Sequence, residues 1–81
     1  MKIEVRLFAT LAEFLPPDGR ATGNAVLEVP DGSTVADVVS RLGIPPALSR
    51  IALVNGEDAS PERRLAARDV VTLFPPLAGG R

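Results

Sequence analysis

Apolar residues occupy every second position from Ile3 to Leu7, and charged residues fill the positions between them. A period of two is typical of a strand with one buried face. Three later segments are short, apolar or β-branched, and bounded by Pro, Gly, Asn or Asp, which also favours strands. The sequence therefore predicts four strands, over residues 2–8, 25–29, 51–54 and 70–74.

The main helix is predicted between the second and third of these strands. Its apolar positions recur at helical spacing, at Val35, Val38, Val39 and Leu42. Thr34 has the character of an N-cap with Asp37 three positions later, and Gly43 would end the helix. One face of this helix should therefore pack on the sheet.

A shorter helix is predicted directly after the first strand. Thr10 and Glu13 have the spacing of a capping box, and Pro16-Pro17 would end the run. The polar, glycine-containing stretch over residues 18–24 is interpreted as a loop. The first two predicted strands would then pair.

These elements predict an α+β fold, with one mixed sheet packed on one main helix. Asn55-Gly56 favours a hairpin turn after the third strand, and residues 60–69 are interpreted as an irregular connection. The first and last strands are expected side by side at the centre of the sheet, which is a β-grasp arrangement. We expect one domain over residues 1–74 and a flexible C-terminal tail over residues 75–81.

Composition excludes several classes of function. The chain of 81 residues has no Cys and no His, which argues against disulfides, thiolate chemistry and the commonest zinc and iron-sulfur sites. A net charge of -1 and only three aromatic residues argue against nucleic-acid binding. No apolar run approaches the length of a membrane span, and charges interrupt the N-terminal apolar residues. We expect a cytoplasmic protein with no metal site.

The C-terminal segment carries the candidate chemistry. Pro75 and Pro76 favour an extended stem, whereas Gly79 and Gly80 have no Cβ and could enter a narrow channel. Such a tail suits activation of a glycine carboxylate inside another protein's ATP site, with the tail as substrate. A Gly-Gly pair alone is also typical of a frayed terminus, so the surrounding residues have to decide.

Several segments resemble the MoaD/ThiS family of sulfur carriers, in which MoaD is the small subunit of molybdopterin synthase. They are Val5–Ala9, Thr34–Asp37, Ala52–Gly56 and Asp69–Gly80. The ending Phe-Pro-Pro-x-x-Gly-Gly is the most specific of them. Its double proline and the chain length look more like MoaD than like the shorter ThiS proteins.

The resemblance implies a ubiquitin-like β-grasp fold and a carrier rather than an enzyme. It implies that a MoeB-like adenylating enzyme uses ATP and Mg to activate Gly80, and that a sulfurtransferase then supplies sulfur for a thiocarboxylate. A larger synthase subunit would receive the tail in molybdenum cofactor biosynthesis. The carrier itself would bind no cofactor. The residues expected to contact these partners are Phe74, Pro75, Pro76, Leu77, Ala78 and Gly79.

Arg81 departs from the family pattern, in which the chain ends at the second glycine. As written, the free carboxylate belongs to Arg81 and the chain should be inactive. Three explanations stay open: a precursor trimmed by a peptidase, a residue left by cloning, or a relative that is not a carrier.

Other residues have two interpretations each. Partner contact is favoured for Leu77, ordinary packing is favoured for Phe8, and both remain open for Phe74. Arg63, Arg64 and Arg68 could steer an acidic partner. A solvated loop is the favoured interpretation of these arginines, because the acidic side chains of Glu57, Asp58 and Glu62 lie close in sequence.

Two alternatives to the molybdopterin hypothesis remain. The same carrier chemistry could serve thiamine, tRNA thiolation, a tungsten cofactor or cysteine synthesis, or could modify proteins. A second alternative is a ubiquitin-like binding module that is never activated, since the fold alone does not decide function.

Overall fold

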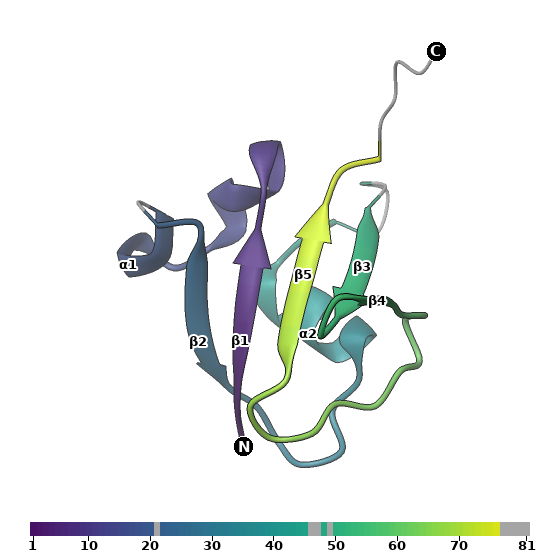
Figure 1. The fold of residues 1–81 in the computed structure, drawn as a ribbon. Helices are drawn as coiled ribbons and strands as arrows, with labels where there is room; N and C mark the ends of the chain where they lie inside the picture. The colour runs from purple at the N-terminus through teal and green to yellow at the C-terminus, as the bar shows by residue number, and fades with distance from the viewer. Residues whose placement is uncertain (21, 46–47, 49, 77–81) are drawn as a thin grey trace.

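Figure 1 shows the computed structural model, which describes residues 1–20, 22–45, 48 and 50–76. A five-stranded sheet has the order β2-β1-β5-β3-β4. Its strands are β1 (Lys2–Leu7), β2 (Asn24–Glu28), β3 (Ile51–Val54), β4 (Glu57–Asp58) and β5 (Val70–Phe74). The four predicted strands are all present, and the structure adds the short β4.

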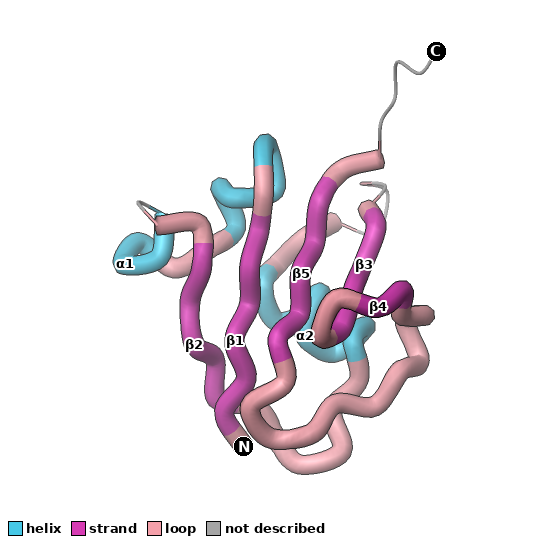
Figure 2. The backbone as a smooth tube through the Cα atoms, in the orientation of Figure 1, coloured by secondary structure: helices cyan, strands magenta, loops and turns pink. Residues whose placement is uncertain are grey.

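The first and last strands lie side by side at the centre of the sheet, as predicted (Figure 2). β1 and β5 are parallel, with Leu7 opposite Leu73, and the other pairs of neighbouring strands are antiparallel. This mixed sheet with one main helix across it is the β-grasp arrangement. Because β5 is central, hydrogen bonds on both of its edges hold the strand that precedes the tail.

The main helix α2 (Val35–Leu42) crosses one face of the sheet (Figure 1). Thr34 Oγ1 accepts a hydrogen bond from the Asp37 N–H at 3.2 Å, and Asp37 Oδ2 accepts one from the Thr34 N–H at 2.9 Å. Gly43 ends the helix with φ 81°, a left-handed conformation that glycine adopts without a steric penalty. The predicted cap and end of this helix are confirmed.

The core lies between α2 and the inner face of the sheet. Every second residue of the strands and the apolar face of α2 contribute to it, as the periods of two for a strand and 3.6 for a helix predict. The buried apolar residues are Ile3, Val5, Leu7, Leu11, Leu15, Val29, Val35, Val38, Val39, Ile44, Val54, Leu65, Val71 and Leu73. The predicted helix residue Leu42 is only partly buried.

The predicted capping box at Thr10 is wrong. The segment Ala9–Phe14 is a 3₁₀ helix that begins before Thr10, and its N-cap residue Phe8 makes no side-chain cap hydrogen bond. Leu11 is fully buried whereas Thr10 is exposed. Packing of Leu11 therefore places the start of the turn, and the polar spacing does not.

The predicted loop over residues 18–24 is wrong in its first part, where the structure has a short helix, α1 (Pro17–Arg20). Pro17 is the first helical residue, a position where its fixed φ is already helical and no N–H is needed. Gly19 faces the start of β2 so closely that an added Cβ would lie 3.0 Å from the Ala25 Cβ and would clash with the Asn24 carbonyl oxygen. A residue without a Cβ is therefore needed at position 19 for α1 to lie this close to β2.

The predicted hairpin turn is confirmed. Asn55 and Gly56 have φ values of 52° and 85°, as a two-residue turn of type I′ requires, and they join β3 to β4. Residues 60–69 form the predicted irregular connection, and one isolated bridge joins Arg64 to Thr34.

Candidate functional site

The base of the predicted tail follows directly from the central strand. β5 ends at Phe74, and Figure 1 shows the chain leaving the sheet beyond this strand. Phe74 and Pro75 are half-buried and Pro76 is exposed. Leu77, Ala78, Gly79, Gly80 and Arg81 lie outside the described residues. The roles of these residues, and the division between domain and tail, therefore stay predictions.

Three apolar residues lie at the tail-base end of the sheet, Phe8 just after β1, Ile51 at the start of β3 and Phe74 at the end of β5, and we call them the sheet-end patch. Ile51 on β3 lies opposite Phe74 on β5, so both side chains are on one face of the sheet. Phe8 follows β1, and its N–H donates a hydrogen bond to the Leu73 carbonyl at 3.1 Å. The patch could seat a partner that also holds the tail.

The favoured interpretation of Phe8 as a packing residue is wrong. Phe8 has extended backbone angles after the buried Leu7, so it points to the opposite face from Leu7, and it is 51% exposed. The sequence did contain a usable signal, because strict alternation through Leu7 already assigns Phe8 to the outer face. The alternation could not predict that Phe8 lies close to Phe74, because this depends on the parallel register of β1 and β5.

Polar residues border the sheet-end patch on the outer face of the sheet. Arg6 lies opposite Thr72, and Arg6 Nε donates to Glu4 Oε2 at 2.7 Å in an exposed ion pair. An apolar centre with a polar border is the usual composition of a protein-protein interface. The patch therefore has the character of a small docking surface.

A hydrogen-bonded network holds the other end of β5. Asn55 Oδ1 accepts from the Val70 N–H at 2.9 Å, and Asn55 Nδ2 donates to Asp69 Oδ1 at 3.0 Å. Asp69 Oδ2 accepts from the Ala66 N–H at 2.8 Å. These bonds to the charged carboxylate lower the pKa of Asp69 from its usual 3.8, the Ala66 N–H having the largest effect and the Asn55 amide the next. The network ties the start of β5 to the turn after β3 and to the connection before β5.

The three arginines of the predicted basic cluster lie in the connection that leads to the start of β5, at the end opposite to the tail base (Figure 1). The Arg68 N–H donates to the Lys2 carbonyl at 2.7 Å, and the Arg63 carbonyl accepts from the Val35 N–H at 3.0 Å. Their backbones thus tie the connection to β1 and α2. The structure does not bring this cluster to the sheet-end patch.

The described residues contain no group of three or more Asp, Glu, Cys or His side chains that could hold a metal ion. In the same part of the chain, no helix is long and apolar enough to cross a membrane.

Comparisons with known proteins agree with the β-grasp fold. The ThiS family model matches residues 5–80. SAMP1 from Haloferax volcanii is 31% identical, with a TM-score of 0.73 over 99% of this chain and 100% of that one. The HVO 2177 protein of the same organism is 29% identical, with a TM-score of 0.77 over 99% of this chain and 87% of that one.

A more distant structure shares the fold. It is a chain in the complex of subunits 1 and 2 of molybdopterin-converting factor from Helicobacter pylori. That chain is 21% identical, with a TM-score of 0.62 over 99% of this chain and 100% of that one. No curated protein sequence matches significantly. The family match spans nearly the whole chain and includes both the β-grasp core and the Gly-Gly segment, so this chain belongs to the ThiS family and has the ubiquitin-like fold of the ThiS/MoaD sulfur carriers.

Proposed function

We propose that this chain is a sulfur carrier whose reactive group is the carboxylate of Gly80. The observation that carries the proposal is the position of the tail base. The central strand β5 ends at Phe74, Pro75 and Pro76 follow at once, and the sheet-end patch lies beside them. The residues after Pro76 would lie within reach of the active site of a partner that docks on this patch, because each residue extends the chain by about 3.4 Å.

The chemistry requires a free carboxylate at Gly80, so the peptide bond between Gly80 and Arg81 must first be hydrolysed. The Gly80 carboxylate then attacks the α-phosphorus of ATP, and pyrophosphate leaves. This makes an acyl-adenylate, whose carbonyl carbon is open to attack because AMP is a good leaving group. A persulfide sulfur of a sulfurtransferase displaces AMP, and a thiol then reduces the acyl disulfide to the thiocarboxylate.

Each of these steps places the catalytic groups in partner proteins. A MoeB-like adenylating enzyme supplies the site for ATP and Mg, and a sulfurtransferase supplies the persulfide. Phe74, Pro75 and Pro76, together with Leu77, Ala78 and Gly79, contact these partners. The chain acts as substrate and carrier in the cytoplasm.

The pathway we propose is molybdenum cofactor biosynthesis, with this chain as the small subunit of molybdopterin synthase. The Helicobacter pylori fold match, a complex of subunits 1 and 2 of a molybdopterin-converting factor, supports a larger subunit as the receiving partner. In that role the thiocarboxylate tail delivers its sulfur inside the larger subunit. Thiamine, tRNA thiolation, tungsten cofactor and cysteine synthesis use the same activated tail with other acceptors.

Protein modification is a second candidate function, favoured by the 31% identity to SAMP1, a small archaeal modifier protein. In this case a lysine amine of a target attacks the Gly80 acyl-adenylate, AMP leaves, and an isopeptide bond forms. Activation is the same as for a sulfur carrier, and only the nucleophile differs.

The test is ATP-pyrophosphate exchange by a MoeB-like enzyme, with a chain that ends at Gly80 and with the chain that keeps Arg81 as control. We expect exchange only with the first. Intact mass of the protein from its native host should then show loss of Arg81 and one sulfur in place of one oxygen. If the chain ending at Gly80 supports no exchange with its cognate enzyme, the carrier proposal is wrong and an unactivated binding module remains.

A further inference from the structure

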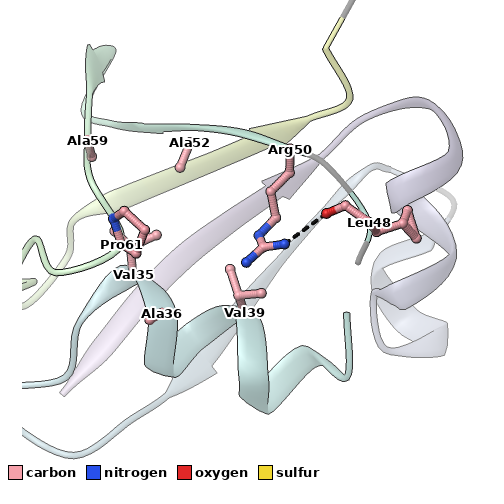
Figure 3. A pocket seen from close by; sticks show the side chains of 8 residues that line it. All are labelled: Val35, Ala36, Val39, Leu48, Arg50, Ala52, Ala59 and Pro61. Carbon is pink, nitrogen blue, oxygen red and sulfur yellow. Dashed lines mark hydrogen bonds between the residues drawn. The ribbon is translucent and has the colours of Figure 1, made fainter. Parts of the chain in front are cut away.

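A hollow lies between α2 and β3, on the helix side of the sheet (Figure 3). Its volume is about 260 Å³, and Val35, Ala36 and Val39 form its helix wall. Ala52 on β3 and Ala59 just after β4 form the opposite wall. Three of these five residues are alanines, and their single methyl groups leave the space between helix and strand unfilled.

A second hollow of about 300 Å³ continues the first along the helix. Both are lined by Ala36, Val39 and Arg50, and the second extends to Gly43 and Pro45 at the end of α2. Together they make an elongated depression, which we call the helix groove. An elongated groove with an apolar floor suits an extended segment of chain better than it suits a compact small molecule.

Arg50 is the one titratable residue among the described residues that line the helix groove. Figure 3 shows its side chain reaching from the start of β3 toward α2, above Val39. One guanidinium nitrogen, Nη1, donates to the Leu48 carbonyl at 2.8 Å, which holds the group in place. Among the described residues the Arg50 guanidinium makes this one hydrogen bond, and its five N–H donors leave others for a ligand. The groove therefore combines an apolar floor with one fixed positive charge.

We propose that the helix groove binds an extended peptide segment of a protein partner, with an aliphatic side chain between Ala36, Ala52 and Ala59 and a carboxylate on Arg50. A carboxylate matches the planar donor pattern of an arginine, and a partly buried pair of this kind is stronger than an exposed one. A second copy of this chain fits poorly, since a two-fold contact through the groove would bring two Arg50 side chains together.

This site differs from the sheet-end patch in both place and chemistry. Ile51 points to the outer face of the sheet with Phe74, whereas Arg50 and Ala52, the residues before and after it, line the groove on the helix side. The chain thus has two docking surfaces near the start of β3. The groove goes beyond the proposed function, because peptide binding there needs neither ATP nor a free Gly80 carboxylate.

The test is a titration of the ¹⁵N-labelled protein with acetylated, amidated tetrapeptides followed by NMR. In three of the peptides Leu and Glu lie one, two or three positions apart, and the other positions are Gly. Three control peptides carry Gln in place of Glu. We expect at least one Glu peptide to shift the amide signals of Ala36, Val39, Ala52 and Ala59 saturably. Its Gln counterpart should bind about tenfold more weakly.

Variants distinguish specific binding in the groove from non-specific attraction between the peptide and positive charges on the protein. Arg50→Gln should weaken binding of the Glu peptide about tenfold and Arg50→Lys by less, because lysine keeps the charge without the planar fork. Arg41→Gln is the matched control, since Arg41 is an exposed arginine on α2 that does not line the groove, and it should leave binding unchanged. Ala36→Leu should fill the groove and abolish the shifts.

Three results would overturn the proposal: no saturable shift up to about 10 mM peptide, equal binding of the Glu and Gln peptides, or shifts confined to other surfaces. Groove shifts that depend on protein concentration without peptide would instead identify a second copy as the occupant.

Discussion

The two ends of β5 are held in different ways. At its start, Asp69 and Asn55 bind each other, and their side chains accept the N–H groups of Ala66 and Val70. At its end, Phe74 is followed by Pro75 and Pro76, which have no N–H to donate and cannot continue the ladder. The difference indicates that side-chain hydrogen bonds fix the register of β5 at its start, whereas the two prolines stop the ladder at its end.

The largest effect is expected from the tail. In a chain that ends at residue 80, Gly80→Ala should lower ATP-pyrophosphate exchange by at least about 100-fold, because a methyl group beside the attacking carboxylate displaces the reacting atoms. The stability of the folded domain should not change. Ala78→Gly is the control, and a rate near that of the parent chain for Gly80→Ala would contradict a narrow channel around the reacting carboxylate.

Adjacent residues at the end of β5 should differ in what they support. Leu73 is fully buried, so Leu73→Ala should lower the free energy of unfolding by about 3 kcal/mol. Phe74→Ala should lower it by less than about 1 kcal/mol, since the ring is half-buried on the outer face. Urea unfolding measures both values.

Phe74 should matter more for binding of a partner than for stability. Phe74→Ala should weaken the complex with the adenylating enzyme about tenfold, as loss of an aromatic residue from an interface centre does. Isothermal titration with Phe74→Ala and Phe8→Ala checks whether the sheet-end patch acts as one surface. Unchanged affinity in both variants would exclude the patch from this interface.

Substitution of Asn55, at the start of β5, should cost less stability than Leu73→Ala. The loss has two causes, missing hydrogen bonds and backbone strain. Asn55→Ala removes two side-chain hydrogen bonds and places alanine at φ 52°, so we expect a loss of about 2 kcal/mol. Asn55→Gly removes the same bonds but tolerates positive φ, so its loss should be roughly half as large. Equal losses in urea unfolding would show that backbone strain plays no part.

The smallest effect is a dependence on pH. The pKa of Asp69 is lowered in the folded protein, so its carboxylate adds stability that is fully present above the unfolded value of 3.8 and is lost as the pH falls through the folded value. Asp69→Asn should therefore be less stable than the parent at pH 7. The difference should shrink in acid, and a difference that is constant with pH would show that the charge is not the cause.

Local patterns predicted most of the fold. The four longer strands, the capped helix α2 and the Asn55-Gly56 turn each depend on residues within a few positions of one another, and all were confirmed. The errors occurred where distant packing overrode a local signal. Leu11 set the start of the 3₁₀ helix in place of Thr10, and the close approach of Gly19 to β2 accompanies a helix where a loop was predicted.

For the candidate site, the sequence by itself determined the chemical character of the tail and the position of the central strand before it. Prolines, glycines and alternating residues carry that information within a few positions. Only the tertiary structure decided which distant residues meet. The parallel register of β1 and β5 brings Phe8 beside Phe74, and the packing of α2 on β3 places Arg50 over a groove lined by alanines. Such neighbours follow from strand order and helix packing, which no short pattern in the sequence encodes.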